Sequence, residues 1–144
     1  MKLNILPLKE SDYEEVLCGW WKTWRWTPPP KNFLPENGTG GFMIYDAEIP
    51  VVAGFLYNTN SDVAWADWVI SNFEYKDKYK RQVAINLLLL SLEERATQMN
   101  KKFMYALVKN KSLVNVYKEQ GYEEASSYTT ELIKKIIIWR QQQQ

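Results

Sequence analysis

The segment over residues 80–99 constrains the fold most, because its apolar residues recur on nearly every side of a helix in its first half. The residues that carry this pattern include Val83, Ala84, Leu87, Leu88 and Leu90. A helix that is apolar around most of its circumference is usually buried between layers of structure. A chain of 144 residues is long enough to build such layers as one domain. We therefore expect a single domain over residues 1–140 and a short glutamine tail over residues 141–144.

Before this helix, short apolar runs separated by turn-forming residues predict a meander of antiparallel strands. The strands are expected at residues 42–45, 51–57 and 63–71, after a short opening strand at residues 3–5. A first helix is predicted over residues 12–24, because apolar residues recur there at helical spacing. The three prolines that follow cannot continue it.

After the long helix, a strand is expected at residues 103–108 and a helix at residues 112–120. Gly121 suits the left-handed residue that ends such a helix. A return to strand is expected from Tyr122, with the final strand at residues 128–138. The spacing of Leu132, Ile133, Ile136 and Ile137 would also suit a helix there. The order predicts an α/β fold with a central mixed, mostly antiparallel sheet and helices on both faces.

The lack of histidine limits the chemistry that the chain can perform. The sequence contains no histidine and a single cysteine, Cys18. These counts exclude histidine-ligated metal sites, histidine-based triads and cysteine-rich zinc sites, so we expect no metal. Any general base must be a carboxylate, a tyrosine, a lysine or a relayed water.

The charge is nearly balanced, with 18 Lys and Arg residues against 17 Asp and Glu residues. This balance does not indicate attraction of the whole surface to nucleic acid or to a membrane. Local binding of nucleic acid stays open. The sequence has neither a run of about 18 apolar residues that could span a membrane nor a signal-peptide pattern. With its single cysteine, the chain is expected to be cytoplasmic.

The most specific pattern lies at residues 110–122, which read NKSLVNVYKEQGY. It resembles the signature N-x-x-A-x-x-L-Y-x-x-x-G-F of the GNAT superfamily of N-acetyltransferases. Asn110, Tyr117 and Gly121 match by spacing, and Tyr122 keeps an aromatic ring where the family has phenylalanine. The expected order of helices and strands is also that of the GNAT-like fold. Taken by spacing alone, Tyr117 would equally suit a half-buried core residue.

The resemblance implies an acyltransferase that moves an acetyl group from acetyl-CoA to an amine of a small molecule or protein by direct attack. In the family, the tyrosine at Tyr117 hydrogen-bonds the coenzyme A sulfur and protonates the leaving thiolate. Asn110 would lie at the strand end beside the cofactor. No covalent enzyme intermediate is implied, so Cys18 is expected to be a core thiol.

The fourth strand of the family binds the pantetheine arm through its backbone. The corresponding residues are Val69, Ile70 and Ser71. Asp67 in the same strand is the candidate general base, with Glu74 as a second, because a buried carboxylate beside tryptophans has a raised pKa. An equal alternative is a structural aspartate. Strict alternation predicts one face with Trp65, Asp67 and Val69, opposite Ala64, Ala66, Trp68 and Ile70.

The phosphate-binding motif of the family, Q/R-x-x-G-x-G/A, falls on residues 79–84. The implied cofactor-binding residues are Lys80, Arg81, Gln82, Val83 and Ala84. A helix N-terminus with lysines around it favours an anion. However, Gln82 replaces a glycine and Tyr79 replaces Gln or Arg. Three alternatives stay open: coenzyme A binds in a shifted position, it binds weakly, or it does not bind.

The acceptor side in the family is formed by the first helix and the loop after it, where Trp24, Arg25 and Trp26 lie. An aromatic pocket for an apolar or cationic acceptor, stacking on nucleic-acid bases, and core packing are all compatible with these residues. The chain is also similar to divergent GNAT-like proteins of tailed phages. Two alternatives follow: a GNAT-fold protein with impaired catalysis that binds a host protein or nucleic acid, and an acyltransferase that modifies phage DNA bases. A monomer and a homodimer are equally compatible with the sequence.

Overall fold

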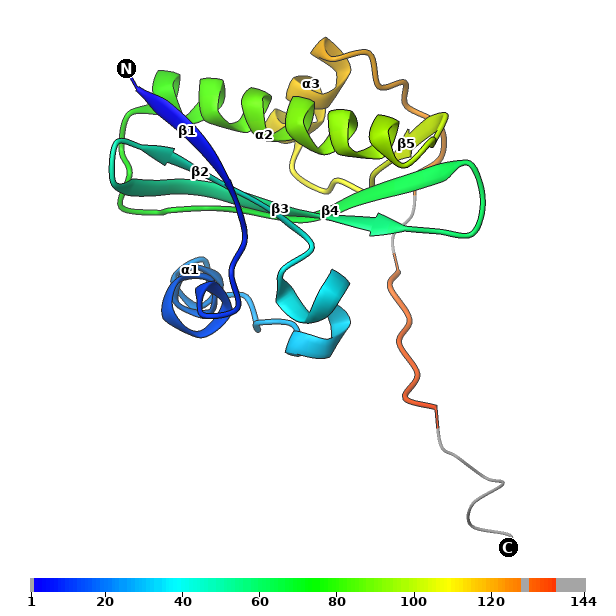
Figure 1. Ribbon diagram of the computed structural model, residues 1–144, viewed down its shortest axis with the longest axis horizontal. Helices are drawn as coiled ribbons and strands as arrows, with labels where there is room; N and C mark the ends of the chain where they lie inside the picture. Colours follow the sequence, from blue (N-terminus) through cyan, green and yellow to red (C-terminus); the bar gives the residue numbers. More distant parts are fainter. Residues whose placement is uncertain (1, 128–129, 137–144) are drawn as a thin grey trace, which may run out of the picture.

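The computed structural model describes residues 2–127 and 130–136. One sheet contains the strands β1 (Leu3–Pro7), β2 (Gly41–Asp46), β3 (Ile49–Asn58), β4 (Val63–Ser71) and β5 (Phe103–Tyr105). Their order in the sheet is the order in the sequence (Figure 1). The first four strands pair antiparallel, whereas β4 and β5 pair parallel. The mixed, mostly antiparallel sheet predicted from the sequence is confirmed.

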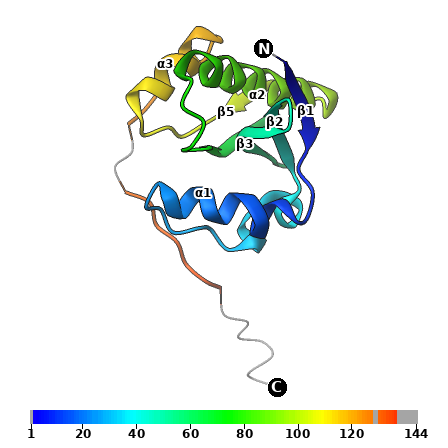
Figure 2. The same ribbon diagram turned by 90° about the vertical axis from the view of Figure 1, so that its left-hand side faces the viewer.

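Helices cover both faces of this sheet, as Figure 2 shows. One face carries the first helix, which starts as a π-helix and continues as an α-helix, together with two short 3-10 turns. These elements are η1 (Tyr13–Leu17), α1 (Cys18–Thr23), η2 (Lys31–Phe33) and η3 (Pro35–Gly38). The other face carries α2 (Lys78–Gln98) and α3 (Lys111–Glu119). The predicted two-sided arrangement is therefore present.

Two apolar cores result, one on each face of the sheet. The core under α2 includes the fully buried residues Val52, Leu88 and Leu92. The core under α1 includes Trp21 and Phe55, which are also almost completely buried. Burial of this apolar area is the main force that holds the helices on the sheet. Within the described residues, no helix is both long enough and apolar enough to cross a membrane.

The C-terminal part of the chain differs from the sequence prediction. Residues 122–127 and 130–136 form neither helix nor strand, and Leu132, Ile133 and Ile136 are exposed. The expected strand is thus wrong for these residues, while residues 128–129 and 137–138 lie outside the described residues. Strand propensity reflects packing against neighbouring strands, and this segment pairs with none in the part of the chain that the structure describes. The expected tail over 141–144 also lies outside the described residues.

Strand β5 is shorter than expected, ending at Tyr105 rather than at Val108. It pairs with β4 only from Val63 to Trp65, and the two strands then separate. Strand β5 therefore ends at the residue where its pairing with β4 ends.

Candidate active site

Strand β4 contains a β-bulge beside Asp67 and Trp68. Phe55 of β3 pairs with Asp67, but Ala53, two residues earlier, pairs with Ile70, so β4 holds one extra residue. Trp68 accommodates the extra residue by adopting a φ of 57°, in the left-handed region that tryptophan rarely adopts. Bulges bend a strand and re-aim its side chains, and they are frequent next to active sites.

The bulge overturns the side-chain alternation predicted along β4. Val69 packs on the α2 side of the sheet, as Ala64 and Ala66 do. Trp68 and Ile70 pack on the α1 side. Asp67 pairs with Phe55, whose side chain belongs to the α1-side core, so Asp67 and Val69 do not share a face. An extra residue shifts the period of two by one position, and the expectation of one face for Trp65, Asp67 and Val69 is wrong for this reason.

Beyond Trp65, the edge of β4 that faces β5 has no strand partner within the described residues. Val69, Ile70 and Ser71 lie in this stretch and therefore offer backbone groups to a ligand on that edge. One of these groups is already used, because the Nε1 of Trp24 donates a 2.8 Å hydrogen bond to the carbonyl oxygen of Ser71. The segment expected to hold the pantetheine arm thus lies where β4 and β5 separate.

Tyr117 lies on α3 and is 4% exposed. Its ring meets that of Tyr122 edge-on at 5.0 Å. Burial, followed by the nearby Tyr122 and Asp67, raises the pKa of the Tyr117 hydroxyl above its ordinary value of 10.0. The hydroxyl therefore holds its proton at neutral pH, so it can act as an acid but not as a base.

Asn110 precedes α3 and caps its N-terminus. Its side-chain oxygen accepts hydrogen bonds from the backbone amides of Ser112 at 2.8 Å and Leu113 at 3.3 Å. Caps of this kind satisfy amides that a helix leaves free in its first turn. Asn110 thus has a structural role, and only its side-chain nitrogen remains for contact with a ligand.

Asp67 is half-buried on the α1 side of β4. One of its carboxylate oxygens accepts a 2.7 Å hydrogen bond from the amide of Trp68. Burial raises the pKa of Asp67 above 3.8, the Trp68 amide lowers it, and the nearby Glu131 carboxylate raises it further. Asp67 is also the last of the groups that raise the pKa of Tyr117, whose ring packs in the core on the α2 side of the sheet.

The predicted phosphate-binding residues begin one residue inside α2, which starts at Lys78. Arg81 donates its amide to the carbonyl oxygen of Asp77 at 2.9 Å, and Lys80 donates to the Asp77 carboxylate at 3.0 Å. Gln82, Val83 and Ala84 lie further along the helix, where amides bond to carbonyls four residues earlier. Residues 78 and 79 therefore carry the free amides of this terminus.

The role of Asp77 as the N-cap of α2 is a feature that the sequence interpretation missed. An aspartate before a helix is a common N-cap signal, but here its negative charge lies where an anion would approach the helix. A depression of about 350 Å³ lies at the same end of α2 and has three carboxylates in its wall, those of Asp46, Glu74 and Asp77. Lys76 and Lys80 also line it. The cap makes this helix terminus less favourable for phosphate than the lysines alone predict.

Among the residues expected on the acceptor side, Trp24 is in contact with β4, whereas Arg25 and Trp26 lie in the loop that follows α1. Trp24 contacts the C-terminal end of β4 and packs edge-on against Phe73 at 5.1 Å. Trp26 is 55% exposed, and Arg25 adopts a φ of 64° where α1 ends. The structure therefore brings Trp24 to the end of β4, four residues beyond Asp67, and not to the bulge.

A second aromatic group, which the sequence interpretation missed, lies beside Asp67. Tyr57, Trp65 and Tyr105 come from the neighbouring strands β3, β4 and β5. The rings of Tyr57 and Trp65 are 5.6 Å apart, and those of Trp65 and Tyr105 are 5.9 Å apart. Only the pairing register brings these three residues together, so no local sequence pattern could have identified them.

Comparison with known proteins finds matches only by structure. The sequence matches no family model and no curated protein. AAC(6')-Iy in complex with the bisubstrate analogue CoA-S-monomethyl-acetylneamine has a TM-score of 0.66 at 10% identity, over 93% of this chain and 99% of its own. N-acetylglutamate synthase from Neisseria gonorrhoeae, complexed with coenzyme A and L-arginine, has a TM-score of 0.68 at 13% identity, over 86% of this chain and 28% of its own.

A third similar structure is the ribosomal-protein-S18-alanine N-acetyltransferase from Escherichia coli, with a TM-score of 0.63 at 16% identity. The match covers 87% of this chain and 80% of that protein. None of these three is described as a phage protein, so similarity to phage-encoded proteins stays a prediction. At such identities the likeness establishes the architecture: the chain has the GNAT-like acetyltransferase fold that its sequence predicts.

Proposed function

We propose that the protein is an N-acetyltransferase that uses acetyl-CoA and an amine acceptor. The observation that carries the proposal is the separation of β4 from β5 beside the bulge, with Asp67 at the bulge and Tyr117 buried on α3. The similar structures in complex with coenzyme A and with a coenzyme A conjugate support the choice of cofactor. Acetyl-CoA would supply the activated acetyl group as a thioester.

The position of each residue suggests its role in the reaction. The free edge of β4 at Val69, Ile70 and Ser71 binds the pantetheine amides by strand-like hydrogen bonds. Asp67 accepts the proton that the acceptor amine loses when its nitrogen attacks the thioester carbonyl carbon. Tyr117 donates its proton to the sulfur as the carbon–sulfur bond breaks. Backbone amides near the bulge stabilise the charge that develops on the carbonyl oxygen.

The phosphates would lie at the start of α2, on the amides of residues 78 and 79, with Lys80 and Arg81 beside them. This position is earlier in the helix than the family motif implies, because the amides of Gln82, Val83 and Ala84 lie within the helical hydrogen-bond pattern. Asp77 opposes an anion at this place, which favours weak binding.

The matched pair Tyr117→Phe and Tyr122→Phe tests the proposal. Both substitutions remove only a hydroxyl group, and the two rings are in contact. We expect Tyr117→Phe to lower kcat about a hundredfold, the lower end of the effect of a general acid, without loss of folding. Tyr122→Phe restores the ring that the GNAT signature carries and should leave kcat unchanged. Equal activity of the two variants would contradict the role of Tyr117.

A second candidate function is binding of a host protein or nucleic acid by a GNAT-like fold without catalysis. Asp77 and Gln82 favour it, because both weaken the phosphate site. It predicts no calorimetric heat with acetyl-CoA at millimolar concentration. A heat that saturates with one cofactor per chain would exclude this candidate.

A further inference from the structure

The three rings of Tyr57, Trp65 and Tyr105 form a surface that we name the aromatic wall. It lies on the α1 side of the sheet, because Trp65 pairs with Tyr57 and Tyr105 and precedes Asp67 by two residues. The wall is open to solvent in part, since Tyr105 is 41% exposed and the other two residues are half-buried. Hydrogen bonds fix its first ring: the Tyr57 hydroxyl donates to the carbonyl oxygen of Phe33 at 2.8 Å and accepts from Trp68 Nε1 at 2.7 Å. The Tyr57 ring is thus held in place before any ligand arrives, and the Trp65 ring packs against it.

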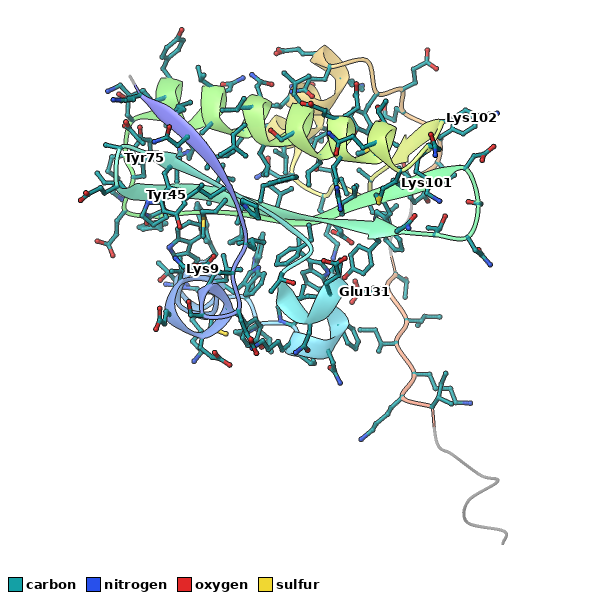
Figure 3. All side chains as sticks on the ribbon, in the orientation of Figure 1. Lys9, Tyr45, Tyr75, Lys101, Lys102 and Glu131 are labelled. Atoms are coloured by element: carbon teal, nitrogen blue, oxygen red, sulfur yellow. The ribbon has the colours of Figure 1, made fainter. Side chains whose placement is uncertain are left out.

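One carboxylate, that of Asp67, lies beside this wall, and a second, that of Glu131, lies on the same side of the sheet. Asp67 follows Trp65 in β4, and Glu131 comes from the C-terminal segment, which runs on the α1 side of the sheet (Figure 3). The charge of Glu131 reaches Asp67, as its effect on the Asp67 pKa shows. Among the described residues, neither carboxylate forms an ion pair. The wall therefore faces negative charge that no described cation neutralises.

We propose that the aromatic wall, with Glu131, binds a cationic group of the acceptor, that the reacting amine of the same molecule lies at Asp67, and that the acceptor is a diamine or polyamine. This inference rests on the proposed function. Aromatic ring faces attract ammonium groups, and carboxylates nearby strengthen the attraction. The reacting nitrogen must be uncharged when it attacks, so a second ammonium group of the same molecule is the one that the wall recognises. A monoamine has no second ammonium group. The carboxylate of an amino acid would be repelled by the negative charge beside the wall.

The acceptor test uses three linear amines of equal chain length: putrescine, butylamine and γ-aminobutyrate. They differ only at the far end, which is cationic, apolar or anionic. We expect kcat/KM to fall in that order, with putrescine about tenfold above butylamine. Trp65→Leu and Tyr105→Leu should remove most of this ratio, and Glu131→Gln should reduce it about threefold. Thermal melts of each variant show whether folding is retained.

Matched controls come from the same elements. Phe103→Leu changes a 65% exposed ring on β5, two residues before Tyr105, and Glu123→Gln neutralises an exposed carboxylate in the C-terminal segment. Both should keep the wild-type ratio of putrescine to butylamine. Equal losses in the controls and in the wall variants would overturn the inference.

A second measurement separates this inference from the proposed function. NMR spectra of the full chain with putrescine, without acetyl-CoA, should show shifts of the Trp65 and Tyr105 signals that saturate. In Glu131→Gln together with Trp65→Leu, the shift of the remaining Tyr105 signal should disappear. If no amine is acetylated but these shifts occur, the cation site stands and the acetyltransferase proposal fails. If all three amines are acetylated equally and no shift occurs, the enzyme stands and the cation site is refuted.

Discussion

The Asp77→Asn variant separates the structural role of the α2 cap from its electrostatic effect on phosphate. Asparagine and aspartate cap helices about equally well, so the hydrogen bond to the amide of Lys80, now 3.0 Å, is expected to persist. Only the negative charge is lost. Its favourable interaction with the helix dipole is worth about 0.3–1 kcal/mol, so the variant should be slightly less stable.

The same substitution should strengthen coenzyme A binding. Two unit charges about 4 Å apart in water interact with about 1 kcal/mol, and the site is exposed, so the water value applies. Removing the repulsion should therefore lower the Kd for acetyl-CoA about fivefold at low salt. The gain should largely vanish at about 1 M salt, where the Debye length is about 3 Å.

Isothermal titration calorimetry at low and high salt measures this effect. Pantetheine, which lacks the pyrophosphate, should bind wild type and Asp77→Asn equally. The control variant is Asp62→Asn, which neutralises an exposed aspartate 4.0 Å from Lys102, at the opposite end of β4. Weaker or unchanged acetyl-CoA binding in Asp77→Asn, or an equal gain in Asp62→Asn, would refute placement of the phosphates at this terminus.

Three further predictions concern stability. Asp67→Asn should stabilise the protein at pH 7, because a raised pKa means that ionised Asp67 opposes folding; in denaturant titrations the difference should shrink as pH falls toward 3.8. Tyr122→Phe should be neutral or stabilising by up to about 1 kcal/mol, since the Tyr122 hydroxyl is buried with no hydrogen-bond partner in the described part of the chain; a loss above that in urea unfolding would contradict this. Gly54→Ala should cost about 1–3 kcal/mol, because its Cβ would lie 3.0 Å from Leu88 and 3.2 Å from Val69; an unchanged midpoint would show that the core yields there.

Local sequence patterns predicted most of the fold. The apolar runs of β2, β3 and β4, bounded by turn-forming residues, and the long apolar helix α2 both depend on neighbouring residues in the chain, and the structure confirms these elements. The spacing from Asn110 to Tyr117 likewise predicted α3 with a buried tyrosine, whereas the strand end expected at Asn110 lies five residues earlier, at Tyr105. These features follow from contacts at short sequence separation, which a pattern records directly.

The rest depended on contacts between distant segments. The bulge at Trp68 is defined against Phe55 and Ala53 of another strand, and so no pattern within β4 reveals it. The aromatic wall needs three strands in register, for the same reason. The strand expected at residues 128–138 failed over its described part because propensity without a partner strand does not form a sheet.

The most direct test of the central claim is amide hydrogen exchange with and without acetyl-CoA. The account predicts that the cofactor slows exchange at Val69, Ile70 and Ser71 on the free edge of β4 and at residues 78 and 79 of α2. The amides of residues 82–84 lie within the helical hydrogen-bond pattern and should change little. Protection at residues 82–84 alone, or no protection along β4, would contradict the placement of coenzyme A between β4 and β5.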